Sequence, residues 1–249
     1  MDLNVSRGPA VAYLSALSFL RKHIVRKTLA SAIGLLAASA LSATSAHASL
    51  ISIGLQEAGY GGGAVTTVKT DAGTGSAIYE GAFGSFTLND IDAVGSPILP
   101  SPNLDSSAIN VSAAAGGTLT VYVTESGLTS PKGVGDFLTA FTSNLFNGAV
   151  KSITESTYIS TTNALYGGTL LASDSFTGLG TKSIVDATPS LGPVFSETEK
   201  FVITTTGAGD VNDTIDITSV PEPASFALLG GGLIALGVAL RRRTLAKVG

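Results

Sequence analysis

Short stretches in which apolar and polar residues alternate recur through the middle of this 249-residue chain. The clearest covers residues 118–124, where Leu119, Val121 and Val123 fall on one side and polar residues on the other. A period of two places the apolar set on one face of an extended strand. The alternation therefore indicates half-buried strands, which are typical of antiparallel sheets.

Similar stretches follow one another along residues 49–219, separated by clusters rich in glycine, proline and asparagine at 59–63, 95–103, 147–148 and 189–193. Many short strands with turn signals between them predict an all-β fold, an antiparallel, jelly-roll-like β-sandwich. A body of this size can bury one core. The candidate strands are residues 50–55, 64–68, 85–88, 108–111, 118–124, 138–145, 150–159, 169–176, 201–203 and 215–217.

The dipeptide Asn147-Gly148 is a favourable two-residue hairpin turn. It predicts that a strand ending at Phe146 pairs with a strand beginning at Ala149. Residues 136–146 also fit a short helix, because their large apolar residues recur every four positions. The threonines in this stretch and the following turn favour the strand.

The first 48 residues have the order of parts found in a secretory signal. A basic cluster at 21–27 precedes an apolar run at 29–41 and then a small-residue cleavage pattern. We expect the translocon and signal peptidase to act here, although a first helix of the mature domain is the alternative. The long stretch before the basic cluster also suggests a start codon later than Met1. The predicted cleavage site comprises Ala46, Ala48 and Ser49.

The C-terminal region has an uninterrupted apolar stretch of 17 residues at 224–240. As a helix it is about 25 Å long, just enough to cross the inner membrane. The basic cluster that follows is expected to remain cytoplasmic, with residues 244–249 as a cytoplasmic tail and the body outside. That cluster is Arg241, Arg242 and Arg243.

Directly before the apolar stretch stands Val220-Pro221-Glu222-Pro223. The two prolines hold this segment extended, as the groove of a protease or transpeptidase requires. Together, the proline motif, the glycine-rich helix and the arginines at 220–243 resemble the PEP-CTERM sorting domain of Gram-negative bacteria. The resemblance implies recognition by an exosortase, export to the cell surface or matrix, and association with exopolysaccharide or biofilm. A rigid linker before a plain membrane anchor is the alternative.

Composition excludes several kinds of chemistry in the body. The chain has no cysteine, and both histidines, His23 and His47, lie in the predicted signal region. Thiol, Ser-His-Asp and imidazole–metal sites are therefore excluded from the mature protein. Residues 49–220 carry five lysines, no arginine and sixteen acidic residues, a formal charge of −11, which disfavours nucleic acid as a partner.

Two acidic runs are weak candidates for calcium ligands, and no other cofactor is expected. Neither run matches a full EF-hand, and Asp and Asn are common in turns, so a structural turn role is the preferred interpretation. The candidate ligands are Asp90, Asp92, Asp210, Asn212, Asp213 and Asp216.

The sequence thus predicts an exported envelope or matrix protein whose body is a non-catalytic structural or binding module. The alternative is a secreted carbohydrate-active enzyme, since a glycosidase needs only two suitably spaced carboxylates. Against the enzyme, the body has no tryptophan to form a sugar platform, and its tyrosines are scattered along the sequence.

Overall fold

A computed structural model describes residues 49–129, 134–187, 190–221, 230 and 232–234. The predicted signal region and cytoplasmic tail, and most of the predicted sorting segment, lie outside the described residues. No helix among the described residues is both long enough and apolar enough for a membrane crossing.

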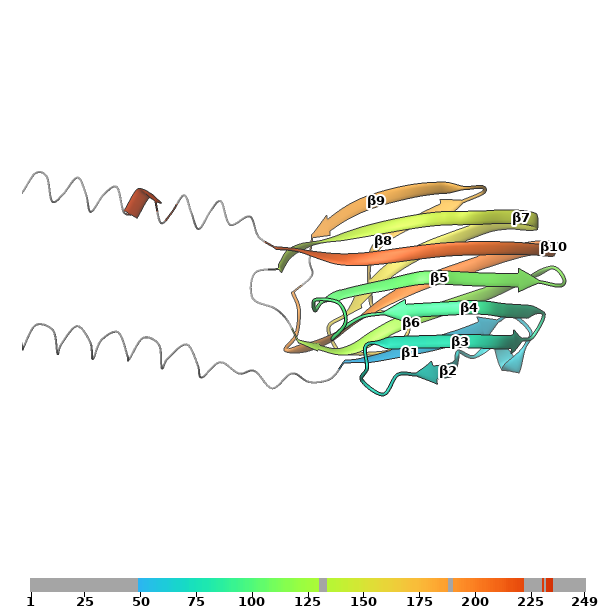
Figure 1. Cartoon of the computed structure of the whole chain (residues 1–249), viewed down its shortest axis with the longest axis horizontal. Coiled ribbons are helices and arrows are strands. Elements are labelled where there is room, and N and C mark those ends of the chain that lie inside the picture. The colour runs from blue at the N-terminus through green and yellow to red at the C-terminus, as the bar shows by residue number, and fades with distance from the viewer. Residues whose placement is uncertain (1–48, 130–133, 188–189, 222–229, 231, 235–249) are drawn as a thin grey trace, which may run out of the picture. The chain divides into compact units, whose positions relative to one another are not determined.

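The described body is built almost entirely of antiparallel strands (Figure 1), as predicted. A short 3-10 turn, η1 (Gly61–Gly63), lies between the first two strands. The strands are β1 (Leu50–Glu57), β2 (Thr66–Thr70), β3 (Ser76–Phe83), β4 (Phe86–Val94), β5 (Asn103–Ala113), β6 (Gly117–Thr129), β7 (Val134–Ser160), β8 (Thr169–Phe176), β9 (Gly180–Ala187) and β10 (Val194–Pro221).

Two long strands, β7 and β10, pair with each other over most of their lengths and run through both layers of the sandwich. Residues 194–205 of β10 pair with β6, and residues 209–218 pair with β5. One layer, sheet I, therefore has the order β2-β1-β6-β10-β7-β8. The other layer, sheet II, has the order β3-β4-β5-β10-β7-β9.

The predicted hairpin turn at Asn147-Gly148 is wrong. Both residues lie inside β7, which continues to Ser160. Gly148 has the positive φ (69°) that favours glycine, and its partner strand shifts register between Thr205 and Gly209. The two strands therefore bend together from one sheet into the other. The structure confirms a strand rather than a helix at residues 136–146.

The core lies between the two sheets and follows the alternation seen in the sequence. Leu119, Val121 and Val123 are fully buried on β6, facing the same interior as Phe137 and Phe141 of β7. Burying each such side chain contributes about 1.5–3 kcal/mol. Two strands, β3 and β9, were not among the predicted ones. These two strands form the opposite edges of sheet II, where side chains are only partly buried and the alternation of apolar and polar residues is weak.

Both ends of the body lie at the same end of the sandwich (Figure 1). Ser49 precedes β1, is 3% exposed, and donates a hydrogen bond from Oγ to the carbonyl of Ser96 (2.8 Å). Pro221 ends β10, opposite Val134 at the start of β7. The opposite end of the sandwich is where β7 and β10 cross between the sheets.

Candidate functional site

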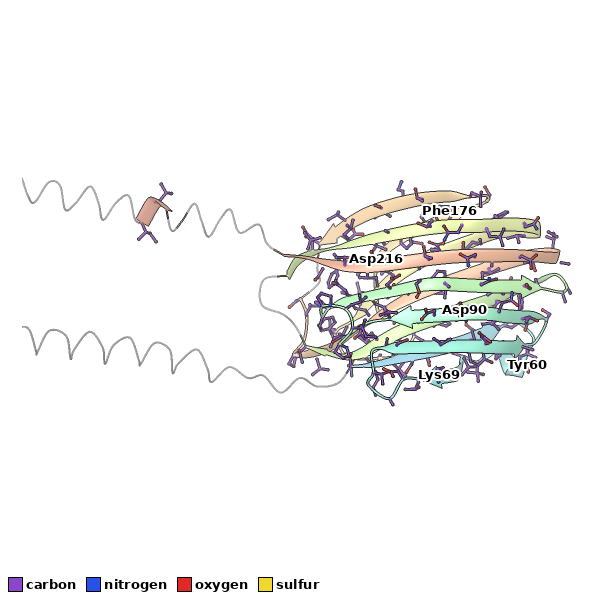
Figure 2. All side chains as sticks on the ribbon, viewed as in Figure 1. Tyr60, Lys69, Asp90, Phe176 and Asp216 are labelled. Carbon is purple, nitrogen blue, oxygen red and sulfur yellow. The ribbon has the colours of Figure 1, made fainter. Side chains whose placement is uncertain are left out.

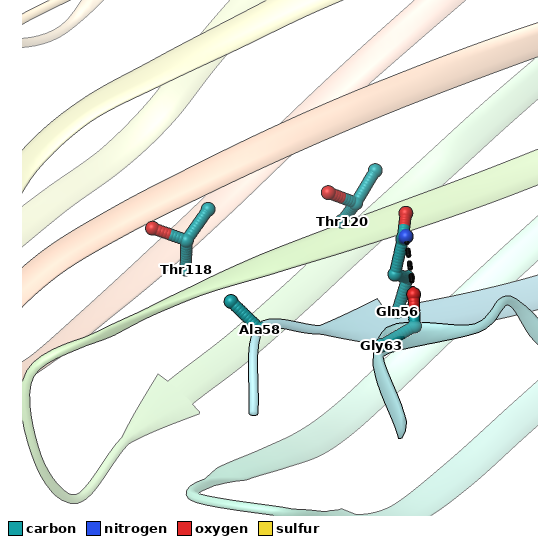
Figure 3. A pocket seen from close by; sticks show the side chains of 5 residues that line it. All are labelled: Gln56, Ala58, Gly63, Thr118 and Thr120. Atoms are coloured by element: carbon teal, nitrogen blue, oxygen red, sulfur yellow. Dashed lines mark hydrogen bonds between the residues drawn. The ribbon is translucent and has the colours of Figure 1, made fainter. Parts of the chain in front are cut away.

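The outer face of sheet I has a hollow of about 380 Å³ at the end of β1 (Figure 3), lined by Gln56, Ala58, Gly63, Thr118 and Thr120. Its size lies in the usual range of small-molecule sites. The two threonines stand on β6 on the face opposite the buried residues 119, 121 and 123. The alternation that builds the core thus also places hydroxyl groups toward this hollow.

Gln56 is held in one orientation by contacts at both ends of its amide. Nε2 donates to the carbonyl of Gly63 (2.7 Å), and Oε1 accepts from the Tyr122 hydroxyl (3.1 Å). An amide group has a second N–H and a second lone pair available beyond these two bonds. The side chain therefore offers one donor and one acceptor, already positioned, at the rim of the hollow.

The tyrosine that holds this amide, Tyr122, is one of three tyrosines on the outer face of sheet I that are far apart in the sequence. Tyr122 is 8% exposed and packs against Tyr166 with ring centroids 5.6 Å apart. Tyr158 of β7 lies diagonally across β10 from Tyr122. Lys200 of β10 places Nζ 5.7 Å from the centre of the Tyr122 ring. Burial raises the pKa of Tyr122 and of Tyr166, so both phenols keep their protons at neutral pH.

Tyr166 belongs to the loop 161–168, which covers part of sheet I. Its hydroxyl bonds to Thr67 Oγ1 (2.6 Å), and its backbone N–H donates to Thr124 Oγ1 (3.2 Å). Its ring lies over Gly54, where an added Cβ would be 2.7 Å from ring carbon Cε1. Glycine at position 54 is therefore required for the loop to close over this half of the face, leaving the half around Gln56 open.

The candidate calcium ligands lie inside strands β4 and β10, so the turn role that the sequence favoured is wrong. Asp90, Asp92, Asp210, Asn212 and Asp216 lie on the outer face of sheet II, with Asp90 and Asp216 labelled there in Figure 2. Asp213 points the other way and is fully buried. Within the described residues, no three acidic, histidine or cysteine side chains are placed to hold a metal ion.

Charge repulsion characterises that outer face of sheet II. Burial raises the pKa of Asp105, and the neighbouring Asp216 and Asp92 raise it further. Asp90 has a raised pKa for the same reasons, with Asp92 and Glu80 as its neighbours.

The sorting segment begins inside the last strand. Ser219 pairs with Phe137, and its N–H and Oγ donate to Asn103 Oδ1 at 3.0 and 3.2 Å. Val220 and Pro221 continue the pairing with β7. The body is thus folded up to the first proline of the motif. The remaining predicted sorting and cleavage residues lie outside the described residues: Ala46, Ala48, Glu222, Pro223, Arg241, Arg242 and Arg243.

Comparison with known families decides what this C-terminal segment is. Residues 219–243 match the family described as the PEP-CTERM protein-sorting motif. The chain carries a PEP-CTERM sorting motif. The motif indicates an exported protein that an exosortase processes. No curated protein matches the chain.

Several solved structures resemble the sandwich that precedes this motif. The module TmCBM61 in complex with β-1,4-galactotriose is 12% identical (TM-score 0.29), over 48% of this chain and 90% of that one. The K1 cleaved adhesin domain of Lys-gingipain from Porphyromonas gingivalis is 12% identical (TM-score 0.31), over 58% and 98%. CBM28, a module specific for non-crystalline cellulose, is 13% identical (TM-score 0.24), over 59% and 86%. At these identities and scores the matches assign no ligand.

The hollow was not predicted from the sequence. Its signal was present in residues 118–124, whose polar side holds Thr118, Thr120 and Tyr122. What the sequence lacked was the pairing that brings Gln56 beside Thr120 and Tyr122.

Proposed function

We propose that the sandwich is a non-catalytic module that binds a neutral polysaccharide at the hollow on the outer face of sheet I. The observation that carries this proposal is the fixed amide of Gln56 among the hydroxyl groups of Thr118, Thr120 and Tyr122. Sugar hydroxyls both donate and accept hydrogen bonds, so they match an amide with one free donor and one free acceptor.

Charge supports a neutral polymer over an acidic one. The body has a formal charge of −11, and an anionic chain would be repelled during its approach. The outer face of sheet II carries much of that charge, while the hollow is lined by uncharged side chains.

The sorting motif supports a role at the cell surface or in the extracellular matrix. In this proposal the signal region is removed before Ser49, the apolar helix holds the precursor in the inner membrane, and the exosortase acts at the motif. Because β10 is paired as far as Pro221, processing beyond that residue leaves the sandwich intact. The body would thus reach a polysaccharide-rich matrix already folded.

A binding assay with one matched substitution tests this function. The body is passed through gels containing either a neutral hexose polymer or a polyuronate, and retardation is measured. We expect retardation in the neutral gel only. Gln56→Ala should weaken it about 3- to 10-fold, because it removes hydrogen bonds worth about 0.5–1.5 kcal/mol.

The control is Asn212→Ala, which removes an amide from the outer face of sheet II. It should leave retardation unchanged. Equal retardation of the parent and Gln56→Ala would contradict the proposed site. Release of reducing sugar from either polymer by the purified body, lost on changing one carboxylate, would instead support the carbohydrate-active enzyme.

A further inference from the structure

The interior of the sandwich contains acidic side chains where a core normally has apolar ones. Glu197 and Glu199 lie on the inward face of β10, in line with Phe195, Phe201 and Ile203. Acidic residues are almost never fully buried unless they are paired. Five carboxyl side chains in the described part of the chain have 0% exposure, and we call them the acid seam: Glu125, Glu155, Glu197, Glu199 and Asp213.

Strand pairing brings the members of the acid seam together. Glu125 of β6 is the direct cross-strand partner of Glu197, and Glu199 follows two residues later on the same face. Glu155 of β7 is the partner of Phe201 on the other side of β10. Asp213 lies on the part of β10 that belongs to sheet II and points inward. The seam therefore lies inside the sandwich, with no side chain of it exposed to solvent.

Few polar groups contact these carboxyls. Ser96 donates its N–H to Glu125 Oε1 (2.8 Å), and Ser106 Oγ donates to Glu199 Oε2 from the opposite sheet. Both carboxyl oxygens of Glu155, Glu197 and Asp213 lack a hydrogen-bond partner within the described residues. The seam is thus buried, and three of its five carboxyl groups have no hydrogen-bond partner among the described residues.

The charged groups facing the seam from neighbouring elements are all acidic. Glu125 faces Asp71 of the β2–β3 turn, and Glu155 faces Asp174 of β8. Asp105 of β5 and Asp216 of β10 lie on the outer face of sheet II, and their charges also raise the pKa of Glu199. Between them, the seam residues also face one another: Glu125 with Glu197, Glu197 with Glu199, and Glu155 with Asp213.

No described lysine neutralises this charge, and residues 49–221 contain no arginine. Lys69, Lys151 and Lys182 are exposed, while Lys200 points to the outer face of sheet I. An ionised carboxylate without a counter-ion in a core costs several kcal/mol. A neutral carboxylic acid avoids most of that cost and gains an O–H that can donate to the next carboxyl.

We propose that the acid seam is protonated in the folded body, so that folding takes up protons and the exported domain loses stability as the external pH rises. This pH dependence arises from residues of the core, and it does not depend on which ligand the hollow binds.

The expected pKa values agree with this geometry. Burial raises the pKa of Glu125 and of Asp213 to about 7, and burial together with Asp213 raises the pKa of Glu155 to about 9. Burial holds the pKa of Glu197 and of Glu199 well above the ordinary value. In the unfolded chain a glutamate titrates near pH ~4.3.

These shifts give the sign of the pH dependence. Between about pH 4 and pH 9 the folded chain holds more protons than the unfolded chain, so stability falls with rising pH. The stability that the protonated carboxyls contribute is fully present below their pKa in the unfolded chain. It is lost as the pH rises through their pKa values in the folded chain. A protein with ordinary surface carboxylates behaves in the opposite way, since acid destabilises it.

Thermal unfolding of the full chain in detergent, with a metal chelator present, tests the proposal from pH 4 to pH 9. We expect the Tm to fall steadily across this range. The double variant Glu155→Gln/Glu197→Gln keeps the side-chain shapes but cannot ionise, so its Tm should be higher at pH 8 by about 4 °C or more. Glu80→Gln, at an exposed position, is the matched control and should follow the parent.

A parent Tm that is constant or rises from pH 5 to pH 9 would overturn the proposal. The proposal would also be overturned if the Tm of the double variant fell with pH as steeply as the Tm of the parent. Calcium at millimolar concentration that restores the parent's Tm at pH 8, but not the variant's, would identify a metal rather than protons as the counter-charge. If the double variant fails to fold, the number of protons that the unbuffered parent takes up during refolding at pH 7 is measured instead. Uptake of about two or more protons per chain would support the proposal, and the absence of uptake would overturn it.

Discussion

The outer faces of the two sheets are chemically different, although the same two strands, β7 and β10, run through both. The face of sheet I carries threonines, tyrosines, Gln56 and Lys200 around a hollow. The face of sheet II carries closely spaced carboxylates, and burial together with neighbouring charges raises the pKa of Asp90 and of Asp105. Strand alternation decides which residues face outward, but only the residue types decide whether a face recognises a ligand or stays solvated.

Hydrogen bonding shows the same difference. On sheet II, Asn89 donates to Asn110 and Ser112, and Ser112 donates to Asp210, so these four side chains satisfy one another. On sheet I, Gln56 is fixed by two bonds and retains a donor and an acceptor. A positioned group with remaining hydrogen-bonding capacity is what a binding site requires.

The largest effect is expected from changing the support of the sheet I face. Gly54→Ala places a Cβ 2.7 Å from the Tyr166 ring and 2.9 Å from Val65 Cγ1. Such overpacking should lower the free energy of unfolding by about 1–3 kcal/mol, measured by denaturant titration. Gly167→Ala in the same loop has open space around it and should not destabilise the body. Equal loss in both variants would show that the loop does not pack as described.

A smaller effect is expected from Tyr122→Phe, which removes only the hydroxyl that orients Gln56. Binding of the neutral polysaccharide should weaken about 3- to 10-fold, while the fold is retained, because one hydrogen bond is worth about 0.5–1.5 kcal/mol. Isothermal titration calorimetry measures the change. Tyr79→Phe on β3, in sheet II, is the control and should bind like the parent. Unchanged affinity in Tyr122→Phe would show that the orientation of the Gln56 amide does not contribute to recognition of the polysaccharide.

The smallest effect is expected on sheet II. Asp105 and Asp216 are direct cross-strand partners, and like charges placed opposite each other are destabilising. Asp216→Asn should therefore raise the free energy of unfolding at pH 7 by about 0.5 kcal/mol and leave polysaccharide binding unchanged. Weaker binding in this variant would mean that the acidic face takes part in recognition, and the contrast between the faces would fail.

The sequence predicted the fold class because alternation is a local signal that survives in each strand. Residues 119, 121 and 123 are buried as their spacing indicates. The error at Asn147-Gly148 arose because turn preferences are local, while the path of β7 is set by its partner β10, which bends at the same level. Gly148 supplies the left-handed conformation for that bend rather than for a turn.

The acid seam and the hollow could not be predicted from the sequence for a related reason. Glu155 stands between Thr154 and Ser156, and neither its charge nor these polar neighbours indicate burial. Its burial follows from the opposing sheet, which the chain reaches only through long-range pairing. Gln56 becomes a site residue in the same way, by lying beside β6. The sorting motif, in contrast, is contiguous and was predicted from its own residues.

The most direct test of the account is a map of amide chemical shifts during titration of the folded body with a soluble neutral oligosaccharide. The account predicts shifts confined to the hollow and its supports, at Gln56, Gly63, Thr118, Thr120 and Tyr122. Shifts centred on the acidic face of sheet II, or no shifts at millimolar sugar, would contradict it.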